Sequence, residues 1–86
     1  MTVDVVEVRP ASGYRLFLRF EDGVQGEVDV AGLISFDGVF AWIRDPQHFA
    51  EVRLLRELGT IGWPNGADLD PDVLYATVTG KPVKID

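Results

Sequence analysis

An alternation of apolar and polar residues on both sides of one short turn constrains the fold most strongly. The apolar positions before and after the turn are Tyr14, Leu16, Leu18 and Phe20, then Val24, Val28 and Val30. A three-residue loop at residues 21–23 keeps both sets on one face, whereas a two-residue loop would mix the faces. We therefore predict a hairpin with a type I turn, a left-handed Gly23 in a bulge, and Arg15 opposite Asp29.

The segments next to this hairpin predict short elements. Residues 3–8 are rich in Val and predict a strand that is either covered on both faces or bulged at Val5-Val6. Pro10 to Gly13 has the composition of a turn. Residues 30–34 predict one helical turn capped by Asp29, and residues 39–44 a second short helix that ends at Asp45-Pro46.

The second half of the chain predicts a closing hairpin and a last helix. Residues 49–55 and 60–63 are the expected strands around a loop at 56–59. The last helix runs from Pro71 to about Val78 and ends at Gly80 and Pro82, with a tail at 83–86. We predict a single α+β domain over residues 1–86, a small, mostly antiparallel β-meander (β-β-β-short helices-β-β-α) with short helices packed against the sheet.

Composition excludes several classes of function. The net charge is −6, with 14 acidic and 8 basic side chains. This argues against direct nucleic-acid binding and against an anionic membrane surface, and it is compatible with a basic protein partner. The chain has no Cys, which excludes disulfides and Cys-based zinc sites. No apolar run approaches the roughly 20 residues of a membrane span and no signal-peptide pattern is present, so we expect a cytoplasmic protein.

No set of residues points to catalysis. His48 is the only histidine, and no Gly-x-Ser-x-Gly elbow provides a nucleophile for it. Because His48 follows Pro46 between two expected elements, we interpret it as a solvent-exposed loop residue. We therefore predict no catalytic residue, no cofactor and no enzymatic activity.

The densest segment of the chain is Trp63 to Tyr75. Its three alternating carboxylates, Asp68, Asp70 and Asp72, resemble the start of a calcium loop. An EF-hand counted from Asp68 would need Gly and Glu where Val73 and Thr79 stand. A helix cap explains the carboxylates better, with Asp70 as the N-cap and Pro71 in the first turn, so we assign no metal site. A weak divalent-cation site stays the alternative, and Trp63 is expected in the core.

This segment also carries a resemblance to a known family. Ile61 to Leu69 followed by Pro71 to Tyr75 resembles the domain of unknown function 2442 family of small bacterial proteins. The earlier pieces of the match are Leu16–Gly23, Val28–Val30 and Gly38–Phe40. The resemblance implies a compact α+β domain without an established enzymatic activity. Similar proteins are often encoded beside another small protein, in arrangements that look like toxin–antitoxin pairs.

Three hypotheses about function follow from these observations. The first is a non-enzymatic protein-interaction module, an antitoxin-like or regulatory partner of a small basic protein. Its expected contact residues are Trp42, Asp68, Asp70 and Tyr75. The second is a small-ligand or divalent-metal-binding protein that uses Asp68, Asp70 and Asp72. The third is a homo-oligomer in which an exposed strand edge pairs with its copy.

Overall fold

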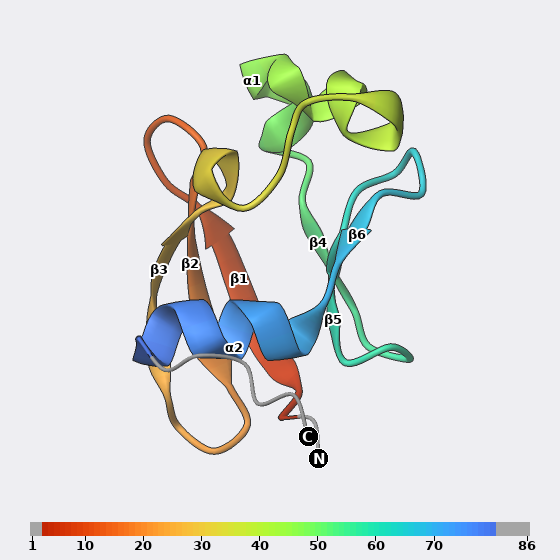
Figure 1. Ribbon diagram of the computed structural model, residues 1–86. Coiled ribbons are helices and arrows are strands. Elements are labelled where there is room, and N and C mark those ends of the chain that lie inside the picture. Colours follow the sequence, from red (N-terminus) through yellow and green to blue (C-terminus); the bar gives the residue numbers. More distant parts are fainter. Residues whose placement is uncertain (1–2, 81–86) are drawn as a thin grey trace, which may run out of the picture.

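Two antiparallel sheets of three strands each build the fold, with short helices connecting them (Figure 1). The computed structural model describes residues 3–80. The first sheet has the order β1-β2-β3, formed by Val5–Pro10, Arg15–Phe20 and Gln25–Asp29. The second has the order β4-β5-β6, formed by Arg53–Leu55, Thr60–Gly62 and Asp68–Leu69. The predicted α+β class with antiparallel, sequentially ordered strands is confirmed, but the strands divide into two sheets.

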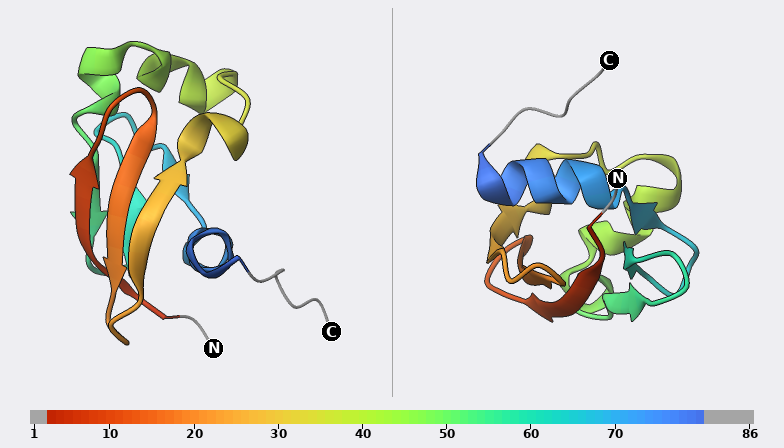
Figure 2. Two further views of the ribbon diagram at one scale, coloured as in Figure 1. Left: turned by 90° about the vertical axis from the view of Figure 1, so that its left-hand side faces the viewer. Right: turned by 90° about the horizontal axis from the view of Figure 1, so that it is seen from below.

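Four helices lie in the described part of the chain. The 3-10 helices η1 (Val30–Gly32) and η2 (Gly38–Arg44) and the short helix α1 (Pro46–Phe49) connect the two sheets. The longest helix, α2 (Pro71–Thr79), follows the second sheet. Figure 2 (right) shows the two sheets and α2 arranged around the interior, with α2 between β3 and the second sheet. The two sheets and α2 therefore enclose the interior of the described chain.

The register of the first hairpin is the predicted one. Leu16 pairs with Val28 and Arg15 with Asp29. Gly23 has a φ of 91°, and its N–H donates to the Phe20 carbonyl at 2.9 Å, which closes the three-residue turn. Leu16, Phe20 and Val28 are almost completely buried. The face that the alternation identified is therefore the core face of this sheet.

The first strand is bulged, which decides between the two predicted alternatives. The register with β2 shifts between Val5 and Glu7. β1 also continues further than predicted, because Pro10 still pairs with Leu16 and does not belong to the turn. On the N-terminal side of the bulge, the Val5 N–H donates to the Gly59 carbonyl at 3.0 Å, which links β1 to the loop between β4 and β5.

The hydrophobic core lies between the two sheets and α2. Its buried side chains come from every strand except β4, and from η1, η2, α1, α2 and the turn before β6: Val5, Leu16, Leu18, Phe20, Val28, Val30, Ile43, Phe49, Ile61, Trp63, Ala67, Leu69 and Leu74. α2 packs against β3, where a Cβ added to Gly26 would lie 3.0 Å from Cγ1 of Val78. The first sheet therefore buries one face, all three residues of β5 in the second sheet are buried, and α2 covers the edge of β3.

The helix caps agree with the sequence prediction at η1 and disagree after η2. The Asp29 side chain accepts the Ala31 N–H at 3.1 Å, as predicted. Asp45 does not lead into a loop: its Oδ1 accepts the Gln47 N–H at 2.9 Å and Pro46 begins α1. The proposed loop at residues 46–48, and a strand that starts at residue 49, are therefore wrong. Pro at the first helical position starts a helix as readily as it ends the preceding one.

The closing hairpin is present with shorter strands and a third partner. Leu55 pairs with Thr60 around the predicted loop at 56–59. β6 was not predicted; it pairs Leu69 with Ile61, and the Thr60 hydroxyl donates to the Leu69 carbonyl at 2.5 Å. A strand of two residues has no measurable period in the sequence. The expected end of α2 at Gly80 is confirmed, while Pro82 and the tail at 83–86 lie outside the described residues.

Candidate functional site

Trp63 anchors the segment that leads from β5 to α2. Its side chain is 3% exposed and its indole N–H donates to the Phe49 carbonyl at 2.9 Å. The Trp63 N–H donates to the Ala67 carbonyl at 2.9 Å, which holds the turn at residues 63–67. The Asn65 side-chain amide donates to the Val39 carbonyl at 2.8 Å and ties this turn to η2. The prediction that Trp63 belongs to the core is confirmed.

The three aspartates have different structural positions. Asp70 is the N-cap of α2, since its Oδ1 accepts the Asp72 N–H at 2.8 Å, as predicted. Asp68 lies in β6 and all three side chains are exposed. Across residues 3–80, no group of three or more His, Cys, Asp or Glu side chains is placed so that it could hold a metal ion. The geometry therefore gives the divalent-cation hypothesis no support.

Tyr75 has partners within the molecule. Its hydroxyl donates to Oδ2 of Asp22 at 2.6 Å, and its ring meets the Phe20 ring edge-on with 5.0 Å between centroids. The hydrogen bond lowers the pKa of the Asp22 carboxyl, and it raises the pKa of the Tyr75 hydroxyl. Tyr75 thus ties α2 to the turn between β2 and β3. Its role as a partner contact stays a prediction.

Trp42 lies at the other end of the molecule, in η2. Its ring stacks on the His48 ring at 4.0 Å with 5° between the planes, and Nδ1 of His48 is 2.8 Å from the Trp42 carbonyl oxygen. His48 is half-buried in α1, so its interpretation as an exposed loop residue is wrong. Figures 1 and 2 (left) place η2 and α1 at the end of the molecule opposite α2, so the structure does not bring Trp42 together with Asp70 and Tyr75.

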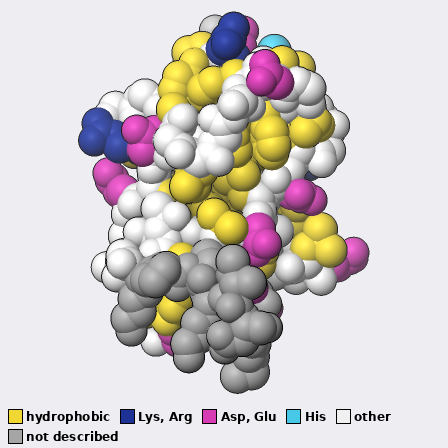
Figure 3. Space-filling view, in the orientation of Figure 1, with side chains coloured by type: hydrophobic (Ala, Val, Ile, Leu, Met, Phe, Trp, Pro, Cys, Tyr) yellow, Lys and Arg dark blue, Asp and Glu magenta, His cyan; other side chains and the backbone are white. Residues whose placement is uncertain are grey.

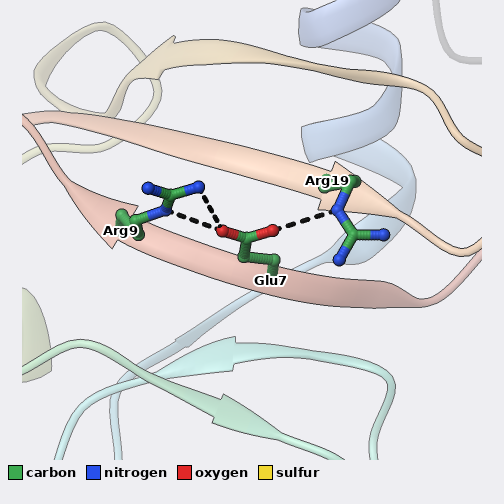
Figure 4. A network of polar contacts seen from close by, with 3 residues as sticks. All are labelled: Glu7, Arg9 and Arg19. Carbon is green, nitrogen blue, oxygen red and sulfur yellow. Dashed lines mark hydrogen bonds and ion pairs between the residues drawn. The ribbon is translucent and has the colours of Figure 1, made fainter.

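The outer face of the first sheet carries a charge network that the sequence did not reveal. Glu7 accepts hydrogen bonds from Nε of Arg9 at 2.7 Å and from Nε of Arg19 at 3.0 Å (Figure 4). Arg19 and then Arg9 lower the pKa of the Glu7 carboxyl. The Arg9 guanidinium lies 5.2 Å from the Phe17 ring centre. The bulge in β1 places Glu7 opposite Arg19, and nothing in the sequence specifies that register.

Charge is distributed unevenly between this face and the rest of the molecule. The register places three arginines and three carboxylates on the outer face, namely Arg9, Arg15, Arg19, Glu7, Glu27 and Asp29. The other charged residues of the described chain are mostly acidic: Asp4, Glu21, Asp22, Asp37, Asp45, Glu51, Glu57, Asp68, Asp70 and Asp72, with Arg44, Arg53 and Arg56. The charges on the outer face of the first sheet therefore balance, and the net negative charge of the described chain comes from the other surfaces.

Two stretches of the chain contain carboxylates and no basic residue. One lies between Arg19 and Arg44, and the other between Arg56 and Lys81. The fold brings them together, because α2 packs against β3 and the Asn65 side chain bonds to Val39. We call the surface of η1, residues 33–37, β6 and α2 the acidic face. Its side chains include Asp37, Asp68, Asp70 and Asp72 and, within these described elements, no Lys or Arg.

The acidic face also presents apolar side chains. Leu33, Ile34 and Phe36 are half-buried, and Val73 on α2 is 38% exposed. Figure 3 shows, above the grey residues, a band of hydrophobic side chains with acidic ones spread around it. Among the described side chains that are visible in that view, Lys and Arg lie near the top and the left margin. The Arg44 guanidinium lies 5.9 Å from the Phe36 ring centre at one end of this band. An apolar surface with charged side chains around it is typical of a protein contact surface.

One depression of the described surface lies at the loop between β4 and β5. It is shallow and open, has a volume of about 330 Å³ and is lined by residues 54–58. Leu58 and Arg56 in this loop are exposed, and the lining contains no Ser, Thr, Cys or His nucleophile. None of the helices in residues 3–80 is long and apolar enough to cross a membrane.

Comparison with known proteins places these features in a family. The family model described as "Protein of unknown function (DUF2442)" matches residues 5–80, which include both sheets and α2. The chain belongs to the DUF2442 family. The match covers the segments that first suggested it, from the hairpin around Gly23 to the Trp63–Tyr75 segment. No curated protein and no solved structure shows a significant similarity to the chain.

Proposed function

We propose that this DUF2442 protein is a non-enzymatic, cytoplasmic protein-interaction module, an antitoxin-like or regulatory partner of a small basic protein. The observation that carries the proposal is the acidic face, where two basic-free stretches of the chain meet beside half-buried apolar side chains. A basic protein supplies the complementary charge for such a face, and nucleic acid does not.

The mechanism is masking of a functional surface on the partner. Carboxylates around the apolar band attract basic side chains and raise the rate of encounter, while burial of the apolar band supplies most of the affinity. Charge attraction between exposed groups is screened over about 8 Å at physiological salt. We therefore expect association to slow when the salt concentration rises, with a smaller change in the dissociation rate.

Affinity purification of the tagged protein from its native host tests the proposal. At low ionic strength we expect a small basic protein to co-purify at stoichiometric level, and mass spectrometry identifies it. The loss of the partner's activity on binding can then be measured in an activity assay of that partner. Recovery of no stoichiometric partner, or of an acidic one, would contradict the proposal.

A matched pair of charge variants tests the role of the acidic face. Asp68→Asn with Asp72→Asn removes two charges from this face without changing the helix cap Asp70. Glu27→Gln with Glu51→Gln removes two charges from exposed residues outside it. Surface plasmon resonance with the purified partner should show slower association for the first pair only. Equal slowing by both pairs would indicate that net charge alone, and not the acidic face, attracts the partner.

A further inference from the structure

We infer that the acidic face binds an amphipathic helix of its partner, which lies against the solvent side of α2 around Val73. This inference rests on the proposed function and adds the docking element and its chemistry. The helix would carry an apolar stripe with Lys or Arg on both sides. Three features of the structure support it: the exposed side of α2, the condition of the strand edges, and the sign of the surrounding charges.

The solvent side of α2 has no long charged side chain. Its exposed positions include Asp72, Val73 and Thr77, and the Thr77 hydroxyl donates to the Val73 carbonyl at 2.8 Å. The buried side of the helix is occupied by Leu74 and by the packing against β3. Figure 2 (right) shows α2 on the outside of the described chain, with no other element of residues 3–80 covering its outer side. A valine in the centre of such a surface can be buried by another helix.

The strand edges leave little room for an added β-strand. α2 crosses β3 at its edge, β1 ends in Pro10 without an N–H, and the Val5 N–H already donates to Gly59. β4 packs towards β1, and β6 has two residues. Strand addition needs a run of free backbone groups along one edge. A partner that binds this molecule therefore presents side chains from a helix more readily than it adds a strand.

The described charges at the start of α2 select a basic occupant. Asp68, Asp70 and Asp72 lie at or before the first turn of α2. A second copy of this chain would place carboxylates against carboxylates if it docked through the same face, which disfavours it as the occupant. An amphipathic helix with basic flanks matches both the apolar centre and the acidic rim.

A synthetic helical peptide with a leucine stripe and flanking lysines is the probe. It is added to the isotopically labelled full chain, and amide chemical shifts are followed by NMR, with a peptide in which glutamates replace the lysines as the control. We expect the lysine peptide to shift the amides of α2 and of residues 33–37, and the glutamate peptide to shift none. Shifts concentrated on the outer face of the first sheet, or no binding at low salt, would overturn the inference.

Two valines of equal exposure provide matched variants. Val73 on α2 and Val6 on β1 are both 38% exposed. Val73→Ser should weaken peptide binding by about 3- to 10-fold, the effect of losing burial of part of one valine, and Val6→Ser should not change it. Equal affinities of the two variants would overturn the inference. These results are independent of the native-host purification, so the docking site can fail while the proposed function stands.

Discussion

Replacement of Trp63 by Phe tests how the turn after β5 is held in the core. The indole is 3% exposed, and its N–H donates to the Phe49 carbonyl, which links the turn to α1. Phe keeps an aromatic ring at the position but loses the donor and part of the volume. The Phe49 carbonyl then retains only the longer bond from the Val52 N–H, at 3.3 Å.

The expected cost follows from these two losses. A neutral hydrogen bond in a buried position contributes about 1 kcal/mol. The smaller ring loses apolar contacts and leaves a small cavity, which together cost about 1–2 kcal/mol. We therefore expect Trp63→Phe to lower the free energy of unfolding by about 2–3 kcal/mol. A domain of this size has a total stability of about 4–13 kcal/mol, so the effect is a large part of it.

Urea denaturation followed by far-ultraviolet circular dichroism measures this cost without depending on tryptophan fluorescence. Trp42→Phe is the matched control, because it is the same substitution at a half-buried ring that stacks on His48. We expect the control to cost less than about 1 kcal/mol. If both variants lose the same stability within about 0.5 kcal/mol, the hydrogen bond to Phe49 does not anchor the turn and the reasoning is wrong.

Three further substitutions test local features. Gly62→Ala should cost about 1–3 kcal/mol and lower the melting temperature, because its Cβ would lie 2.7 Å from the Ala67 carbonyl oxygen; Gly32→Ala, whose Cβ would meet nothing within 4 Å, is the control. Asp70→Ala should cost about 1 kcal/mol through loss of the α2 cap, and Asp68→Ala much less, in the same denaturation assay; equal costs would contradict the cap. Tyr75→Phe should destabilise the protein at neutral pH, and the difference from the parent should vanish in acid. The folded pKa of Asp22 is lowered by this bond, so its contribution is present above the ordinary carboxyl pKa and is lost as the pH falls through the lowered value. Melting curves between pH 7 and about pH 2 check this, and a difference that persists at the acid end would contradict it.

Much of the first sheet was predictable because its determinants are local. Alternation identified the core face, and the choice between a two- and a three-residue loop set the register that pairs Leu16 with Val28. The caps at Asp29 and Asp70 were predictable for the same reason, since a cap bonds to an N–H only two residues away. The Asp45-Pro46 pair carries the same local signal for a helix start, because Asp45 caps α1 and Pro46 is its first residue, and the same pair also ends η2.

The second sheet was less predictable because its third strand depends on a partner. Asp68 and Leu69 form β6 only where β5 offers Ile61 and Gly62 beside them. The Glu7 network similarly depends on the bulge in β1, which shifts Glu7 opposite Arg19. His48 is half-buried because α1 places its ring against Trp42, a contact between two elements and not a property of the loop composition.

The sequence by itself determined the α+β class, the first hairpin and the helix caps, because these follow from side-chain periodicity and hydrogen bonds between near neighbours. It also determined that two stretches, between Arg19 and Arg44 and between Arg56 and Lys81, contain no basic residue. Only the tertiary structure decided that these stretches share one face, through the packing of α2 on β3 and the bonds from Tyr75 to Asp22 and from Asn65 to Val39. Contacts between residues so far apart in the chain depend on the completed core, and no local pattern specifies them.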